Sequence, residues 1–109
     1  MGSKFSEIFD LFMVQVKDWR LQSLYESSTL DFEVYLSGFL MLSIPQFEEV
    51  CNQSLAHNEE SKEFTEVLTL DNKTILSKLM VEKWLEKEVQ DVNQMNLHHL
   101  YNHNDIHTF

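Results

Sequence analysis

The order of apolar and polar residues along the chain predicts a protein built mainly from helices. The clearest stretch covers residues 70–95, which contain neither Gly nor Pro. Thr69 precedes it as an N-cap, and Asp71 places negative charge in the first turn, where the helix dipole favours it. Apolar residues recur there at the three- and four-residue spacing of a helix face. We therefore expect a long central helix around which the other elements pack.

The apolar face of this helix changes side along its length. At about 100° per residue, the first group of apolar residues shares one side and the second group lies mostly on another. The first group consists of Ile75, Leu76, Leu79 and Met80, and the second of Trp84, Leu85, Val89, Val92 and Met95. We expect different partners to cover the two parts of the helix, and we expect Trp84 to be buried.

A second amphipathic pattern predicts a helix over residues 4–20. Its stripe, with intervals of three and four, consists of Phe5, Ile8, Phe9, Phe12, Val16 and Trp19. Leu11, Met13 and Val14 add apolar surface outside that stripe. Two interpretations remain open for these three residues: a wide core face, or a second surface that meets another subunit. They are the candidate subunit-interface residues.

The middle of the chain contains more turn signals. Residues 21–25 read as a connector, and Ser28 or Thr29 can cap a helix that continues to about residue 42. Pro45 disfavours helical conformation at Ile44, so this helix should end or kink there. The polar residues 52–62 predict a flexible loop. Residues 63–68 are extended in character: they form either one strand, which needs a partner from another segment or another chain, or simply the lead-in to the long helix.

Composition agrees with a helical fold. The chain has 109 residues, two Gly and one Pro, which favours long helices in a single domain. The predicted fold class is therefore all-α, a small helical bundle around the long central helix. Asn and Asp residues weaken helix formation near the C-terminus, so we expect a flexible tail from about residue 96. No apolar run reaches the roughly 18 residues of a membrane span.

The charge of the chain restricts its partners. Eight basic residues stand against 18 acidic ones, which gives a formal net charge of −10, and residues 21–61 contain no Lys or Arg. A surface that binds duplex DNA needs basic side chains to replace counterions along the phosphates. Specific nucleic-acid binding is therefore not expected.

Candidate chemistry is sparse. His99, His103 and His107 have the spacing with which a helix can hold a transition metal, but the segment is a poor helix former and its only nearby carboxylate is Asp105. We expect no physiological metal site and no cofactor. Cys51 reads as a buried structural thiol, since nothing local brings a base to it. No phosphate-binding loop or nucleophile motif occurs, so an enzyme is not expected.

Three segments carry a resemblance to a known family. They are KFSEIFDLFM at the start, SIPQF in the middle and LDNKTILSKLMVEKWL after an acidic loop. In this order along nearly the whole chain, they resemble the head–tail connector (adaptor) proteins of tailed bacteriophages of Gram-positive hosts. The shared features are apolar patterns and a Met-x-x-x-Trp-Leu step in the capped helix.

The resemblance implies a structural subunit of the phage neck. Such subunits form a ring, commonly of about twelve copies, that joins the portal protein of the DNA-filled head to the tail or to a stopper or tail-completion protein. DNA would pass through the channel without specific binding, past an acidic wall that does not adhere to it. The protein would be found in the virion neck, and in the host cytoplasm during assembly, with no membrane association. The candidate portal-contacting tail residues are Leu100, Tyr101, Ile106 and Phe109.

Two other functions fit the sequence. An acidic inhibitor that mimics DNA would use the net charge and the middle segment free of Lys and Arg, although it should present rows of carboxylates, and the long helix alternates acidic residues with Lys. A small cytoplasmic regulator would act through helix-in-groove contacts.

Overall fold

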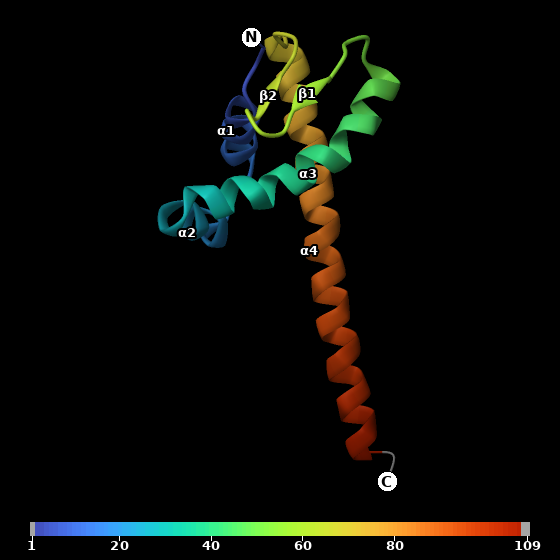
Figure 1. The fold of residues 1–109 in the computed structure, drawn as a ribbon. Coiled ribbons are helices and arrows are strands. Elements are labelled where there is room, and N and C mark those ends of the chain that lie inside the picture. The colour runs from blue at the N-terminus through green and yellow to red at the C-terminus, as the bar shows by residue number, and fades with distance from the viewer. Residues whose placement is uncertain (1, 108–109) are drawn as a thin grey trace.

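The computed structural model describes the backbone of residues 2–107 and the side chains of residues 2–94. The described chain is mostly helical, with a small hairpin (Figure 1). Its elements, in chain order, are α1 (Phe5–Gln15), α2 (Trp19–Ser27), α3 (Thr29–Val50), β1 (His57–Asn58), β2 (Glu63–Phe64) and α4 (Leu70–His107). The predicted fold class, a small helical bundle around a long helix, is confirmed.

The helix predicted over residues 4–20 is in fact two helices. α1 ends at Gln15, and Val16 has extended backbone with φ −113° and ψ 107°. Asp18 then caps α2, because its carboxylate accepts a hydrogen bond of 2.8 Å from the backbone N–H of Arg20. The expected connector at 21–25 is therefore helical. Trp19, expected in the buried stripe, begins α2 and is 76% exposed.

α3 continues past residue 42, where its end was expected, and it bends near Pro45, which agrees with the second of the two predicted alternatives, an end or a kink. Its start is capped as predicted, by the Ser28 hydroxyl, which accepts a hydrogen bond of 3.2 Å from the backbone N–H of Asp31. Pro45 has no N–H to donate to the carbonyl of Met41, and the buried Ser43 hydroxyl donates to the carbonyl of Phe39 at 2.8 Å. Both features bend helices. Figure 1 shows α3 changing direction in its C-terminal part, so the helix bends but does not end.

The extended segment predicted at residues 63–68 finds its partner within the chain. β1 and β2 pair antiparallel, with His57 opposite Phe64. The N-terminal segment lies along the other edge of β2: the N–H of Phe64 donates to the carbonyl of Ser3 at 2.8 Å, and the N–H of Ser3 donates to the carbonyl of Glu66 at 3.1 Å. This hairpin occupies part of the region expected to be a flexible loop, and it fixes the start of α1 beside the lead-in to α4.

The core lies between α1, α3 and the first half of α4. Thr69 caps α4 as predicted, since its hydroxyl accepts a hydrogen bond of 3.1 Å from the N–H of Asn72. Phe12 and Trp84 meet edge to face, with ring centroids 6.3 Å apart. The burial predicted for Trp84 is confirmed, at 9% exposed. The largest fully buried apolar side chains are Phe5, Ile8, Phe12, Leu36, Leu40, Phe47, Leu55, Phe64, Leu76 and Met80.

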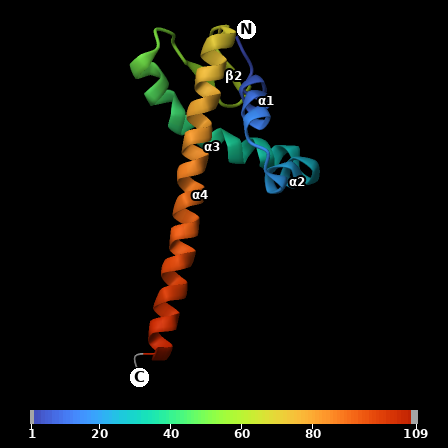
Figure 2. The same ribbon diagram turned by 180° about the vertical axis from the view of Figure 1, so that it is seen from behind.

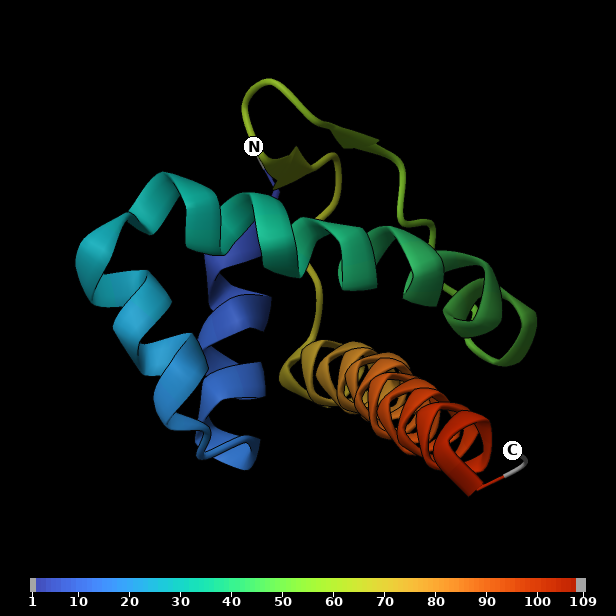
Figure 3. The same ribbon diagram turned by 90° about the horizontal axis from the view of Figure 1, so that it is seen from below.

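The second half of α4 leaves this core as an arm (Figures 1 and 2). The helix continues past Met95, where the sequence predicts its end, as far as His107. Extending an established helix costs far less than starting one, and the segment contains no Gly or Pro, so its Asn residues do not stop it. Seen from below, α1, α2 and α3 cover only part of the circumference of α4 (Figure 3). None of the helices in the described part of the chain is both long and apolar enough to cross a membrane.

Candidate functional site

The arm exposes a stripe of apolar side chains. Leu85, Val89 and Val92, which we call the arm stripe, are 48%, 57% and 52% exposed. Their spacing of four and three residues places them on one helix face. Beside Leu85 and Val89 runs an open groove bordered by Glu82, Glu86 and Gln90. This face has a large apolar component and nothing in the described chain covers it.

On the side of α4 that faces the core, the residues change from apolar to charged after Trp84. Lys87, Glu88 and Asp91 follow Trp84 on the side of α4 that faces the core. Lys87 donates a hydrogen bond of 2.6 Å from Nζ to Asp91 Oδ2, and this bond raises the pKa of Lys87. Because charged residues occupy the core-facing side of α4 beyond this point, Trp84 is the last of the described side chains of the helix that packs in the hydrophobic core.

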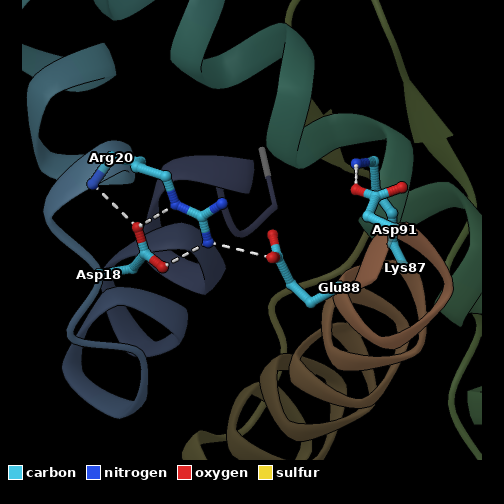
Figure 4. Close-up of polar contacts among 5 residues, drawn as sticks. All are labelled: Asp18, Arg20, Lys87, Glu88 and Asp91. Carbon is cyan, nitrogen blue, oxygen red and sulfur yellow. Dashed lines mark hydrogen bonds and ion pairs between the residues drawn. The ribbon is translucent and has the colours of Figure 1, made fainter. Parts of the chain in front are cut away.

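An ion-pair cluster joins the start of α2 to α4 at this point (Figure 4). The Arg20 guanidinium donates from Nη2 to Asp18 Oδ2 at 2.8 Å and to Glu88 Oε2 at 3.0 Å. The hydrogen bonds from Arg20 hold the pKa of Asp18 below its ordinary value, and the two carboxylates raise the pKa of Arg20. Asp18 therefore stays ionised and Arg20 stays charged near neutral pH. We call these three residues, Asp18, Arg20 and Glu88, the latch, because their ion pairs connect α2 to α4.

A hollow of about 200 Å³ adjoins this latch, between α2, α3 and α4. Trp84 and Tyr35 form part of its wall, and the latch residues, Lys87 and Asp91 border it. All five of these charged groups already form short ion pairs with one another. The hollow therefore offers few polar groups that still need a partner. Within the residues whose side chains are described, no cluster of three or more His, Cys, Asp or Glu side chains is arranged to hold a metal.

A second surface, of mixed polar and apolar groups, lies where α1 turns into α2. A hollow of about 370 Å³, which we call the corner hollow, is lined by Met13, Val16, Lys17, Asp18, Trp19 and Gln22. The break after Gln15 creates it, because α2 runs in a different direction from α1 and the two do not continue as one helix (Figure 3). Trp19 stands at its edge, 76% exposed, and Val14 nearby in sequence is 73% exposed. A tryptophan this exposed beside a hollow is typical of a surface that receives another chain.

The candidate subunit-interface residues lie partly at this corner. Leu11 and Met13 are half-buried, and Met13 packs against the core and lines the corner hollow. Val14 points outward. Their role between subunits stays a prediction. The sequence analysis missed Trp19 as a surface residue, and the signal that identifies it is Asp18, a good N-cap placed inside an otherwise helical pattern.

Several other candidates lie outside the described side chains. The predicted portal-contacting residues Leu100, Tyr101 and Ile106 fall in the part of α4 for which only the backbone is described, and Phe109 lies outside the described residues altogether. The histidines considered for metal binding lie there too. Cys51 is half-buried against the core, more open than the buried thiol expected from the sequence.

Comparison with known proteins does not assign this chain to a family. No protein-family model matches the chain, and no curated protein or solved structure matches it either. Other apolar side chains of the described chain are also exposed, among them Leu30, Val34 and Val50, but the arm stripe and the corner hollow each combine exposed apolar groups with a groove or a hollow.

Proposed function

We propose that this protein is a structural subunit that works by contacting other chains, and that its assembly is a ring in the neck of a tailed phage. The observation that supports this is the presence of two unlike surfaces with exposed apolar groups on one small chain, the arm stripe and the corner hollow. Head-to-tail contacts, which close into rings, require two different surfaces on each subunit. A ring of about twelve copies would join the portal protein to the tail or to a stopper protein, as the resemblance implies.

The acidity of the chain suits this role. Its net charge of −10 disfavours adhesion of DNA to any wall that it builds. The end of the fold near the hairpin has exposed carboxylates that form no ion pair with any described residue: Glu48, Glu49, Glu59 and Glu60. A subunit with this charge also repels its neighbours, so we propose that the free protein associates weakly and that the portal serves as the template. Simultaneous contacts to a portal and to neighbours raise the effective concentration without stronger individual contacts.

The test combines the free protein with a portal ring from the phage that encodes it. Analytical ultracentrifugation of the free chain should show mainly monomer, and cryo-microscopy of the mixture should show a ring of this protein on the portal. A stable ring of the free chain at micromolar concentration, or a portal without added density, would contradict the proposal. Val14→Asp tests a candidate interface residue: it should weaken ring formation on the portal and leave the fold intact, because Val14 is exposed.

The exposed carboxylates near the hairpin favour one alternative, an acidic inhibitor that mimics DNA. Against it, carboxylates on the α1, α2 and α4 side of the fold form ion pairs with Lys or Arg, as Glu7, Asp18 and Asp91 do. Affinity capture from the host separates the two functions. Recovery of a nucleic-acid enzyme, with no binding to portal, would favour the inhibitor.

A further inference from the structure

We propose that the arm stripe of one copy packs into the corner hollow of the next copy, with Leu85 and Val89 against Met13 and Trp19. This inference rests on the proposed function as an assembly subunit and identifies the surfaces that would meet. One surface is the exposed face of a projecting helix, and the other is a hollow of about 370 Å³.

The two surfaces cannot meet within one chain. The core-facing residues Leu76, Met80 and Trp84 define the side of α4 that packs on the fold. At about 100° per residue, the arm stripe lies on nearly the opposite side of the helix. Figure 3 shows α1 and α2 on the covered side of α4. The stripe of one copy therefore requires another chain to cover it.

An exposed cation at the border of the corner hollow is complementary to carboxylates at the border of the arm stripe, while Asp18, the carboxylate at the border of the hollow, is already paired within the latch. Lys17 borders the corner hollow, is exposed, and forms no ion pair with any described residue. Glu82 and Glu86 border the arm stripe. Glu82 has no ion-pair partner among the described residues, and Glu86 has only a 4.0 Å contact with Lys83. Packing the stripe into the hollow brings an unpaired cation to two carboxylates, which favours this orientation.

Pairing of the stripe with the hollow also covers both exposed surfaces at once. A symmetric dimer formed by two arm stripes would leave Trp19 exposed in both copies. In a head-to-tail contact, each copy gives its stripe to one neighbour and its hollow to the other. Contacts of this kind extend to rings when the rotation between copies closes.

Thiol cross-linking of the full-length chain tests the pairing. Gln22 borders the corner hollow and Gln90 borders the groove beside the stripe, and both are exposed. In a Cys51→Ser background, the chain with Gln22→Cys and Gln90→Cys is treated in concentrated solution with a short thiol cross-linker. We expect a ladder of dimers, trimers and larger species. Thermal melts followed by circular dichroism confirm that each variant folds.

The single-cysteine chains are the matched controls. Each alone should give only background dimer, while a mixture of the two should give a dimer containing one of each. Abundant dimer from Gln90→Cys alone would show that two stripes pair with each other and would overturn the proposal. A double-cysteine chain that gives no more than the single-cysteine background would overturn it too.

The strength of association between copies of charge-reversed variants provides an independent measurement. Lys17→Glu should weaken association about two- to fivefold, the range of an exposed ion pair, and Glu82→Lys with Glu86→Lys in the same chain should restore it. Lys4→Glu changes the net charge equally at the hairpin end and should weaken association less. Equal weakening by Lys17→Glu and Lys4→Glu would contradict the contact.

The outcome for this contact is separable from that for the neck assembly. A ladder from a protein that does not bind portal supports the pairing and contradicts the neck function. A ring on the portal whose subunits do not cross-link between positions 22 and 90 contradicts the pairing and leaves the neck function in place.

Discussion

The two halves of α4 belong to one continuous helix but have different surroundings. In the first half, Leu76 and Met80 are fully buried and Trp84 is 9% exposed. Directly after Trp84, the apolar residues move to the uncovered side, where Leu85 and Val89 are 48% and 57% exposed. The first half is held by α1 and α3, whereas the second is joined to the rest of the chain through the Arg20 latch to Glu88.

This difference suggests separate roles for the two halves: the first half of α4 stabilises the fold, and the second half is free for the proposed assembly. Burial of apolar surface in the first half stabilises the chain itself, at about 25 cal/mol per Å² removed from water. The same kind of residue in the second half contributes little to the isolated fold, because solvent still reaches it. An apolar stripe maintained on a helix without an internal partner is typical of a surface that another molecule covers.

The largest expected effect is at the end of the first half. Trp84→Ala should reduce the free energy of unfolding by about 3–5 kcal/mol, because it empties a site packed against Phe12. Chemical denaturation followed by circular dichroism measures this loss. The adjacent Leu85→Ala serves as the control: because Leu85 is exposed, its truncation should reduce the free energy of unfolding much less. A loss below about 1 kcal/mol for Trp84→Ala would contradict the boundary placed between the two halves.

A smaller effect comes from the ion pair that joins the first half to α1. Glu7 accepts hydrogen bonds from the N–H of Lys4 at 2.9 Å and from Lys73 Nζ at 2.7 Å, and these bonds, in that order, lower the pKa of Glu7. A lowered carboxyl pKa stabilises the fold above its ordinary value, and this contribution is lost as the pH falls through the folded-state pKa. Since Glu7 is 40% exposed, the contribution should stay below about 1 kcal/mol.

Denaturation at a series of acidic pH values tests this sign. The wild type should lose more stability than Glu7→Gln as the pH falls below about 4. Asp91→Asn offers a contrast, because the bond from Lys87 to Asp91 lies within α4 and joins no other element. Equal acid sensitivity of wild type and Glu7→Gln would show that this pair does not stabilise the fold.

The smallest effect on the isolated chain is expected in the arm stripe. Val89→Ala and Val92→Ala should each change the free energy of unfolding by less than about 0.5 kcal/mol, as surface substitutions do. The same variants should weaken assembly measurably, because the removed methyl groups lie on the proposed contact. Stability loss as large as that of a core residue would mean that the stripe is covered within the free chain.

The sequence predicted much of this division but not its full geometry. A shift of the apolar face was visible in the spacing, but the spacing placed it after Met80, whereas Trp84 is still buried and the shift follows it. The caps Thr69 and Ser28 lie where they were predicted. The break between α1 and α2 was missed because the apolar spacing continues across it, and only Asp18 signals a new start. The corner hollow depends on that break, so it could not be predicted from periodicity.

Other differences have similar physical origins. Proline disfavours a helix interior locally, but α3 buries apolar side chains on both sides of Pro45, Leu40 before it and Phe47 after it. Helix propensity near Met95 is only a weak guide, and α4 continues as far as His107. The β1 partner of β2 lies in a polar segment too short to give an alternating pattern.

Hydrogen exchange of backbone amides tests the central claim most directly, since it compares the two halves of α4 within one molecule. In the free protein, amides at residues 76–84 should exchange slowly, and those at 85–92 should exchange much faster through local opening. On assembly, the amides at 85–92 should slow markedly while those at 76–84 change little. Equal protection of both halves in the free chain, or no slowing at 85–92 on assembly, would contradict the account.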